Sequence, residues 1–300
     1  MSNQKLRVIT FNYIPSAYRM VRDWIEENGH EHVLAITTSG PKSRPTPSYK
    51  EVLAMIPRHV DTLVTTRLRK VATPLIRALK PDIILCYSFP YRITPEICAI
   101  PTYGAINIHP SLLPAYRGPN PMRQFYDGAE RMSSTAHWIA PDYDTGHVLS
   151  QISAEMPRIV SGATTAQWGQ IIRQTIAEGV AQAVAGNPGV PQDDSQATYA
   201  AKYTDAEKWI NFDEPTHVVL RKTMGLNLTG GLARAEIDGA AYHIKCAEVA
   251  SCDNAPAGAV IQRDEWGFTI GTADGAIRVH TEPFSSKTKL PYPLGMEYLA

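Results

Sequence analysis

Short apolar runs alternate with helix-like stretches over the first half of this 300-residue chain. Residues 6–11 and 32–37 are two such runs, and between them Met20, Val21 and Trp24 recur at helical spacing. Further runs of the same kind follow at residues 83–86, 104–109 and 133–139. This order of strand, helix and strand is typical of a parallel sheet whose strands are joined by crossover helices. We therefore expect an α/β domain built on an open, mostly parallel sheet.

The end of this alternation predicts where the first domain stops. Helical periodicity is present at residues 49–56, 71–79 and 164–185. Residues 187–196 then combine two prolines, a glycine, two aspartates and a serine, a composition typical of a linker. We place the first domain at residues 1–186 and the linker at residues 187–208.

The remaining residues, 209–300, change to a period of two. Apolar and charged residues alternate from 233 to 246 across Asp238-Gly239, and the pattern returns from 268 to 279 across Asp274-Gly275. Aspartate followed by glycine between alternating runs is a strong signal for a β-hairpin. We therefore expect a second, smaller domain, an antiparallel sheet or barrel preceded by one helix.

Composition and charge restrict the partners and the compartment. The chain is 44% apolar and 19% charged, and its 29 basic residues equal its 29 acidic ones, so no global charge favours nucleic acid or an anionic membrane. The four cysteines form no CxxC pair, the N-terminus has no signal-peptide pattern, and no run of about 18 apolar residues occurs. We expect a soluble, cytoplasmic protein.

Common cofactor motifs are missing from the sequence. No GxGxxG follows the first predicted strand, and no GxxxxGK[ST] occurs, which argues against NAD and ATP. There is no HExxH, and the nine histidines do not group with carboxylates at metal-ligand spacing. We therefore expect no metal.

Two polar residues share one face at the end of a predicted strand. Asn107 and His109 are two residues apart, so their side chains point the same way, opposite to Ile106 and Ile108. In an open parallel sheet, ligands bind at the carboxyl ends of the strands. On spacing alone a structural interpretation is the commoner one, in which Asn107 caps a turn and His109 is a hydrogen-bonded core histidine.

A third polar group follows the predicted strand at 133–139. Asp144 lies within Asp142 to Gly146, a composition that by itself predicts only a turn. Taken with Asn107 and His109, it supplies an amide donor, an imidazole and an acid. No serine or cysteine nucleophile stands beside the histidine, so this set suits acyl transfer to an amine without a covalent intermediate.

The segments from Asn107 to Gly118, NIHPSLLPAYRG, and from Asp142 to Gly146, DYDTG, closely resemble the signature of the 10-formyltetrahydrofolate-dependent formyltransferases. The similarity covers about residues 81–155. It continues more weakly over residues 199–279, which resemble the small OB-like C-terminal domain of methionyl-tRNA formyltransferases. The resemblance implies a Rossmann-like catalytic domain followed by an OB-like β-barrel, with 10-formyltetrahydrofolate as co-substrate. Purine-pathway members lack the second domain, which favours the methionyl-tRNA architecture.

The resemblance also implies roles for the site residues. Asn107 and His109 would donate hydrogen bonds to the oxyanion that forms when a deprotonated amine attacks the formyl carbon. Asp144 would keep His109 protonated and relay the proton of the amine toward the folate nitrogen. The folate would lie against Phe89, Pro90, Tyr91, Arg92, Ile93, Pro141 and Asp142. The SFPYR loop is nearer to that of amino-sugar formyltransferases, and the alternative is an aromatic pair that merely packs.

The acceptor amine is where the sequence gives conflicting signals. Residues 40–80 contain nine basic and two acidic residues, a local excess that favours a polyanion such as tRNA, although a solvated helix face explains part of it. From residue 187 to the end, ten basic residues stand against fifteen acidic ones, which favours a small amine such as an amino sugar or a hydroxyornithine-like precursor. The predicted acceptor-binding residues are Lys42, Arg44, Ser111, Tyr116, Arg117 and Gly118.

Other interpretations stay open at this level. A formyl-folate hydrolase that uses water as acceptor needs the same histidine and aspartate, and a non-catalytic binding module is a further alternative. His137 is expected to be a supporting or core histidine, and Cys86 an inert buried thiol. Trp209, Trp266 and Phe268 are expected in the core of the small domain. The oligomeric state stays open.

Overall fold

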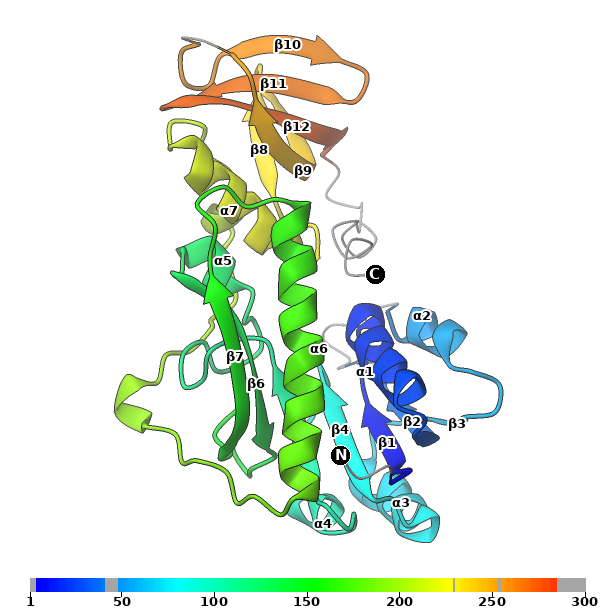
Figure 1. Ribbon diagram of the computed structural model, residues 1–300. Coiled ribbons are helices and arrows are strands. Elements are labelled where there is room, and N and C mark those ends of the chain that lie inside the picture. Colours follow the sequence, from blue (N-terminus) through cyan, green and yellow to red (C-terminus); the bar gives the residue numbers. More distant parts are fainter. Residues whose placement is uncertain (1–3, 41–47, 229, 253–254, 285–300) are drawn as a thin grey trace. The chain divides into compact units, whose positions relative to one another are not determined.

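A computed structural model describes residues 4–40, 48–228, 230–252 and 255–284 (Figure 1). The chain forms two compact units, and it passes between them more than once. The first unit comprises Met1–Pro119, Ser133–Ser153 and Gln170–Tyr199, and the second comprises Asn120–Met132, Ala154–Gly169 and Ala200–Ala300. Because these units are defined by packing, the domain boundaries proposed from the sequence stay a prediction.

The first unit is built on a seven-stranded sheet with the order β3-β2-β1-β4-β5-β6-β7. The strands are β1 (Arg7–Phe11), β2 (Glu31–Thr37), β3 (Asp61–Val64), β4 (Ile83–Tyr87), β5 (Ala105–His109), β6 (Arg131–Trp138) and β7 (Val148–Glu155). The first five strands in this order, from β3 at the edge through β2, β1 and β4 to β5, pair in parallel, and β6 is antiparallel to β5. The predicted, mostly parallel sheet is therefore confirmed. Its strand order reverses between β1 and β4, the position where open α/β sheets form a ligand crevice.

The apolar runs become strands because both faces of this sheet are covered. All five residues of β4 are buried, which explains why it reads as a continuous apolar run without alternation. Helix α1 (Pro15–Glu27) begins with a proline in its first turn and buries one face that includes Met20, Val21 and Trp24. The other α-helices are α2 (Ser48–Met55), α3 (Thr73–Leu79), α4 (Pro95–Cys98), α5 (Arg123–Asp127), α6 (Gly162–Val184) and α7 (Thr216–Leu228).

Two parts of this sheet region differ from the sequence prediction. The helix expected at residues 71–79 is a π-helical turn over Leu68–Ala72 followed by α3, which starts at Thr73 because Pro74 fits only a first helical turn. Strand β3 was not predicted. It is four residues long and largely exposed, so it lacks the apolar run by which its neighbours are recognised.

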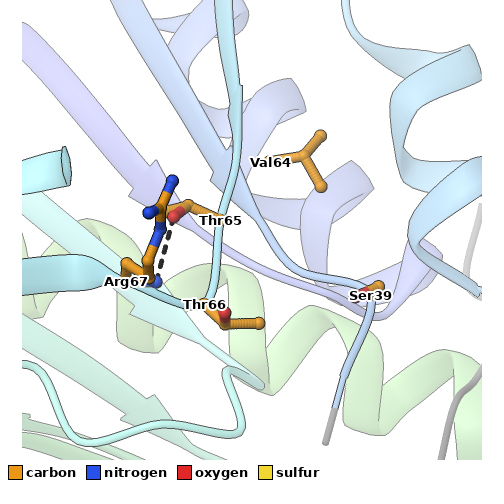
Figure 2. Close-up of a pocket in the computed structure, with 5 residues that line it drawn as sticks. All are labelled: Ser39, Val64, Thr65, Thr66 and Arg67. Atoms are coloured by element: carbon orange, nitrogen blue, oxygen red, sulfur yellow. Dashed lines mark hydrogen bonds between the residues drawn. The ribbon is translucent and has the colours of Figure 1, made fainter. Parts of the chain in front are cut away.

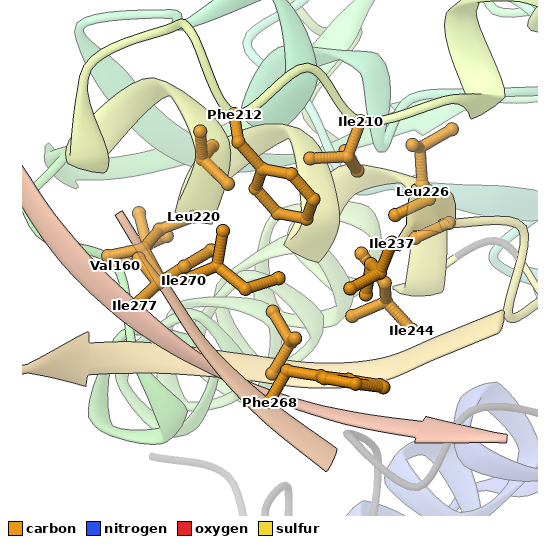
Figure 3. Close-up of a cluster of buried hydrophobic side chains, with 14 of the residues drawn as sticks. Val160, Ile210, Phe212, Leu220, Leu226, Ile237, Ile244, Phe268, Ile270 and Ile277 are labelled. Carbon is orange, nitrogen blue, oxygen red and sulfur yellow. The ribbon is translucent and has the colours of Figure 1, made fainter. Parts of the chain in front are cut away.

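The second unit contains a five-stranded antiparallel sheet with the order β10-β11-β12-β9-β8. Its strands are β8 (Arg234–Ile237), β9 (Ala240–Ala250), β10 (Val260–Asp264), β11 (Gly267–Thr272) and β12 (Gly275–Pro283). Figure 3 shows the apolar cluster of this unit, in which α7 contributes Leu220 and Leu226 and the sheet contributes Ile244, Phe268 and Ile277. The predicted small antiparallel domain is confirmed.

The aromatic residues of this unit separate into buried and exposed ones. Phe268 lies in the core as expected. The same expectation is wrong for Trp209 and Trp266, which are 38% and 66% exposed. Trp266 stands in the turn between β10 and β11, where its backbone N–H donates to the Asp264 carboxylate, so the chain reverses there and leaves the indole outside.

No helix in the described ranges is long and apolar enough to cross a membrane.

Candidate active site

The pairing of β5 with its neighbours brings three polar side chains together. Asn107 stands in register with Cys86 of β4 on one side and with His137 of β6 on the other. Since directly paired residues of adjacent strands point to the same face, Asn107 and His137 meet there. His109 follows two residues later on the same face, at the carboxyl end of β5. The sequence located Asn107 and His109, and the structure adds His137 beside them.

The DYDTG turn carries Asp144 to this group. Asp144 adopts a left-handed conformation with φ of 58°, which aspartate tolerates better than most residues. A Cβ atom on Gly146 would stand 1.6 Å from the carbonyl oxygen of Trp138 at the end of β6. Glycine is therefore required at this position for close approach to the strand. That approach sets the place of Asp144 relative to the sheet.

Of the three residues predicted to be catalytic, Asp144 lies within contact distance of the other two. The Oδ1 atom of Asp144 lies 3.3 Å from Nδ2 of Asn107 and 3.4 Å from Nδ1 of His109. Its other oxygen, Oδ2, accepts a hydrogen bond of 2.8 Å from the backbone N–H of Gly118. The side chains of His109 and Asp144 are only 6% and 10% exposed. The site is thus a nearly dry cluster in which each polar contact is worth more than in water.

Backbone carbonyls fix where the imidazole protons lie. Nε2 of His109 is 2.8 Å from the Tyr116 carbonyl oxygen, so this nitrogen carries a proton and Nδ1 is the free base that faces Asp144. Nδ1 of His137 is 2.8 Å from the Trp138 carbonyl oxygen. Its Nε2 therefore accepts the 3.0 Å hydrogen bond from Asn107 Nδ2. His137 supports Asn107, in keeping with the prediction of a supporting histidine.

Burial and neighbouring charge set the ionisation of the pair. Burial alone would raise the pKa of Asp144, but His109, His137 and the Gly118 N–H outweigh it, so this pKa lies well below its ordinary value. Burial lowers the pKa of His109, and the opposing influence of Asp144 and the Tyr116 carbonyl does not cancel that effect. At neutral pH the imidazole is therefore neutral. That Asp144 keeps His109 protonated stays a prediction, which the burial of the imidazole opposes.

Cys86 lies on the neighbouring strand. Burial raises the pKa of its thiol, and the negative charge of Asp144 raises it further. A thiol in this state is neutral at physiological pH and a poor nucleophile, as expected from the sequence.

The segments predicted to hold the folate come together at the edge of the cluster. Arg92 forms an ion pair of 3.3 Å with Asp142, and its guanidinium lies over the ring of Tyr143 with 4.9 Å to the ring centroid. Pro141 is exposed and Pro90 is half-buried. The loop after β4 and the turn before Asp144 are thus joined by the Arg92 side chain.

The aromatic residues of the loop after β4 also pack inward. The Phe89 ring stands edge-on to Phe11 with centroids 5.2 Å apart and is 6.0 Å from Tyr91. Both rings are partly buried against the core of the parallel sheet, and Ile93 is buried within it. Phe89 and Tyr91 therefore pack against the core, as the alternative interpretation of this aromatic pair expected. Contact of these rings with folate stays a prediction.

The residues predicted to bind the acceptor differ in what they expose. Ser111 is fully buried and donates to the Ala115 carbonyl, and Arg117 is 2% exposed and bound within the protein. This burial argues against a direct contact of these two side chains with the acceptor. Tyr116, with φ of 59°, and Gly118 remain candidates. Lys42 and Arg44 lie outside the described residues.

Figure 2 shows a separate polar pocket of about 230 Å³ at the carboxyl ends of β2 and β3. Its lining consists of Ser39, Val64, Thr65, Thr66 and Arg67. The backbone N–H of Arg67, and not its guanidinium, donates a hydrogen bond of 3.0 Å to the Thr65 hydroxyl. The pocket was not predicted from the sequence, because it lies at the end of β3, a strand without an apolar run. Among the described residues, no group of His, Cys, Asp or Glu is arranged to hold a metal ion.

Comparison with known proteins places the chain in a family. The formyl transferase family matches residues 22–184, and the formyl transferase C-terminal domain matches residues 202–293. The chain therefore belongs to the formyltransferase family. This membership confirms the prediction of a formyltransferase enzyme with an α/β domain and a small antiparallel second domain.

Among its relatives, the methionyl-tRNA formyltransferase of Macrococcus caseolyticus is 31% identical over 208 residues, which are 68% of this chain and 66% of that protein. HypX from Aquifex aeolicus, solved in complex with tetrahydrofolic acid, has a TM-score of 0.68 at 18% identity, covering 96% of this chain and 46% of HypX. WlaRD, a sugar 3N-formyl transferase solved in the presence of dTDP and 5-N-formyl-THF, has a TM-score of 0.62 at 15% identity, covering 93% and 98%. The two structural likenesses concern the fold alone.

Proposed function

We propose that this enzyme transfers a formyl group from 10-formyltetrahydrofolate to a primary amine, with a methionyl-tRNA-type acceptor as the first candidate. The proposal rests on two atoms that lie 3.4 Å apart, His109 Nδ1 and Asp144 Oδ1. Each of them has an unshared electron pair that can accept a hydrogen bond. With the imidazole neutral, neither atom holds a proton, so the complementary ligand is an N–H donor such as an amine. The use of tetrahydrofolate derivatives in the structures of HypX and WlaRD supports folate as the co-substrate.

The reaction balances with these residues alone. The lone pair of the amine forms a bond to the formyl carbon, and the C=O electron pair moves onto the oxygen. When this intermediate collapses, the bond between the formyl carbon and N10 breaks. The amine has then lost one proton and N10 has gained one, which gives a formamide and tetrahydrofolate.

His109 is the proton carrier in this proposal. Its Nδ1 atom is a free base at neutral pH and takes the proton of the amine as the new bond forms, then returns it to N10. Asp144 is a weak proton acceptor because its pKa is depressed, so its role is to stabilise the imidazolium that forms beside it. This assignment moves the proton relay from Asp144, where the sequence placed it, to His109.

Asn107 is the donor to the developing oxyanion. Its amide nitrogen makes a 3.0 Å bond to His137 and a longer 3.3 Å bond to Asp144. The longer bond is the weaker one, so a negatively charged oxygen replaces it at little cost. Loss of one such donor costs on the order of 3 kcal/mol in comparable acyl-transfer sites.

The charge of the segment before β4 supports an anionic acceptor. Of its nine basic residues, Lys42 and Arg44 lie outside the described residues, and Arg77 pairs with Glu96 at 3.2 Å. The remaining six are exposed and form no ion pair with a described carboxylate, namely Lys50, Arg58, Arg67, Arg69, Lys70 and Lys80. Together with the hydroxyls and the guanidinium of the pocket in Figure 2, they favour a phosphate-bearing acceptor.

A small amine is the alternative acceptor. The ten basic and fifteen acidic residues from residue 187 to the end give that part a net charge of minus five, which disfavours a long contact with tRNA. An amino sugar that carries phosphate would need only the basic segment and the pocket. Water as the acceptor, which makes the protein a hydrolase, is the third possibility.

The test measures conversion of 10-formyltetrahydrofolate to tetrahydrofolate by the purified protein. Charged initiator methionyl-tRNA, a panel of amino sugars and ornithine derivatives, and a sample without amine are compared, each with a His109→Ala control. Formylation of the tRNA supports the first candidate, turnover with a small amine supports the second, and turnover without amine supports the hydrolase. Absence of His109-dependent turnover under all three conditions would refute the proposed function.

We further propose the cytoplasm as the compartment. All four cysteines are free thiols, as expected of a chain in a reducing environment.

A further inference from the structure

The segment predicted to be a linker packs closely onto the candidate site. The backbone of Val190 exchanges two hydrogen bonds of 2.8 Å with Val148 of β7. Eight residues later, Thr198 accepts hydrogen bonds from the backbone N–H groups of Tyr116 and Arg117. Residues 187–199 thus bridge the loop after β5 and the start of β7 as a strap within the first unit.

One side chain of this strap binds both halves of the site. Nε2 of Gln192 donates to the carbonyl oxygens of Asp144 and Gly146 at 2.9 and 2.8 Å. Its Oε1 accepts from Nε and Nη2 of Arg117 at 3.1 and 2.8 Å. Both amide hydrogens and both oxygen lone pairs are therefore used. A side chain with all four hydrogen bonds made has one orientation only.

Arg117 completes a closed ring of contacts. It is 2% exposed, and its Nη2 also donates to Asp194 at 2.8 Å, so Nε and Nη2 of the guanidinium are both bonded within the strap. The next residue, Gly118, donates its backbone N–H to Asp144 Oδ2 at 2.8 Å. The ring runs from Asp144 through Gln192 and Arg117 to Gly118 and back to the Asp144 carboxylate.

This ring constrains a residue in an uncommon conformation. Asp144 has φ of 58°. Tyr116, whose carbonyl accepts the hydrogen bond from His109, also has positive φ, at 59°. Both turns store local strain that only their surroundings can hold. Gln192 bonds to the first turn directly and to the second through Arg117, the neighbour of Tyr116.

We propose that Gln192 is a positioning residue that, together with Arg117, sets the distance between the Asp144 carboxylate and His109. The inference rests on the proposed function for its catalytic consequence. Gln192 touches no reacting atom, so it acts through Asp144 and, by way of Arg117, through the Tyr116 turn. A misplacement of about 1 Å at a reacting group can cost up to about 100-fold in rate, and this fold-change in kcat is the expected effect of losing the ring.

The test uses two substitutions and one matched control. Gln192→Met removes all four hydrogen bonds at similar volume. Gln192→Glu keeps the oxygen that binds Arg117 and replaces the donor to Asp144 and Gly146 by an acceptor, so it breaks the ring at the Asp144 side only. Gln196→Met is the control, because Gln196 lies in the same strap, is exposed, and its side chain bonds to Ser195 and to no other described residue.

Two readouts are taken on each protein that melts cooperatively: kcat and KM for formyl transfer, and the titration midpoint of His109 by NMR. We expect both Gln192 variants to lose about 10- to 100-fold in kcat with little change in KM, and the His109 midpoint of Gln192→Met to move to lower pH. The added carboxylate of Gln192→Glu raises the His109 midpoint by its charge, so this variant is judged by kcat. Gln196→Met should match the wild type. An unchanged His109 midpoint in Gln192→Met overturns the proposal, as does an unchanged kcat, because either shows that the ring does not act through Asp144. Should Gln192→Met not fold, the kcat of Gln192→Glu decides.

The two proposals fail in different ways. A wild-type protein inactive with every acceptor refutes the proposed function. The midpoint comparison between wild type and Gln192→Met then still decides whether the ring positions Asp144, since it needs no substrate.

Discussion

Replacing Asp144 by asparagine removes the negative charge beside His109 and leaves the shape of the side chain almost unchanged. The amide oxygen of the new residue keeps the hydrogen bond from the Gly118 N–H, which is 2.8 Å in the native protein. The amide nitrogen then faces His109 Nδ1 and can donate to its lone pair. The imidazolium is therefore disfavoured twice, by the loss of an opposite charge and by a hydrogen bond to the neutral form.

The expected size follows from the distance. Two unit charges 3.4 Å apart, the separation of His109 Nδ1 and Asp144 Oδ1, interact by about 5 kcal/mol at an effective dielectric constant of about 20. Because each 1.36 kcal/mol is tenfold in rate, this corresponds to a loss of roughly three to four orders of magnitude in kcat. The loss of the same interaction also lowers the pKa of His109.

The assay combines single-turnover formyl transfer with NMR titration of the His109 ring, assigned by its absence in His109→Ala. The matched control is Asp238→Asn, the same chemical change at an exposed hairpin residue that also has positive φ, at 51°. We expect this control to keep native kcat and the native His109 titration. A kcat within tenfold of wild type for Asp144→Asn, or a His109 midpoint that does not move to lower pH, would refute the assignment of Asp144 as the counter-charge.

Two further predictions concern stability. Gly146→Ala should destabilise the protein by roughly 3 kcal/mol or more, because the added Cβ would stand 1.6 Å from the Trp138 carbonyl oxygen, and the backbone must shift to relieve this overlap. An unchanged melting temperature would contradict this close approach. Burial lowers the pKa of His32 to about 4, below the unfolded value of 6.5. Between these values the unfolded chain binds a proton that the folded chain does not, so the free energy of unfolding should fall by up to about 3 kcal/mol as the pH drops from 6.5 to 4. Urea denaturation at several pH values should show this loss in the wild type and a smaller one in His32→Gln.

The sheet could be predicted from the sequence because burial on both faces has a local signature. In β4 every residue is buried against one face or the other, so the strand appears as an uninterrupted apolar run. Strand β3 lies at the edge and carries exposed residues, so it has no such signature. Trp209 and Trp266 show the opposite error, since residue type alone does not say on which side of a turn an aromatic ring stands.

The candidate site was partly predictable for a similar reason. Asn107 and His109 share a face through the two-residue period of a strand, which is a property of the sequence itself. His137 joins them through strand pairing, and a reader of the sequence would need the register of β5 and β6 to place it. The ionisation of His109 depends on burial from all sides, which no local pattern contains.

Gln192 shows most clearly what local patterns leave out. Prolines, glycine and aspartates indicate that residues 187–196 form no regular element of their own, and the structure agrees apart from a single bridge at Val190 and a short 3₁₀ turn at Asp194–Gln196. Such a composition does not indicate that the segment lacks neighbours. An irregular segment must satisfy its polar groups somewhere, and the half-buried amide of Gln192 bonds to the buried guanidinium of Arg117 and to the Asp144 turn. Residues that position a polar site can therefore lie on an irregular segment packed against the loops of the site, and not only on the strands that carry the sequence motif.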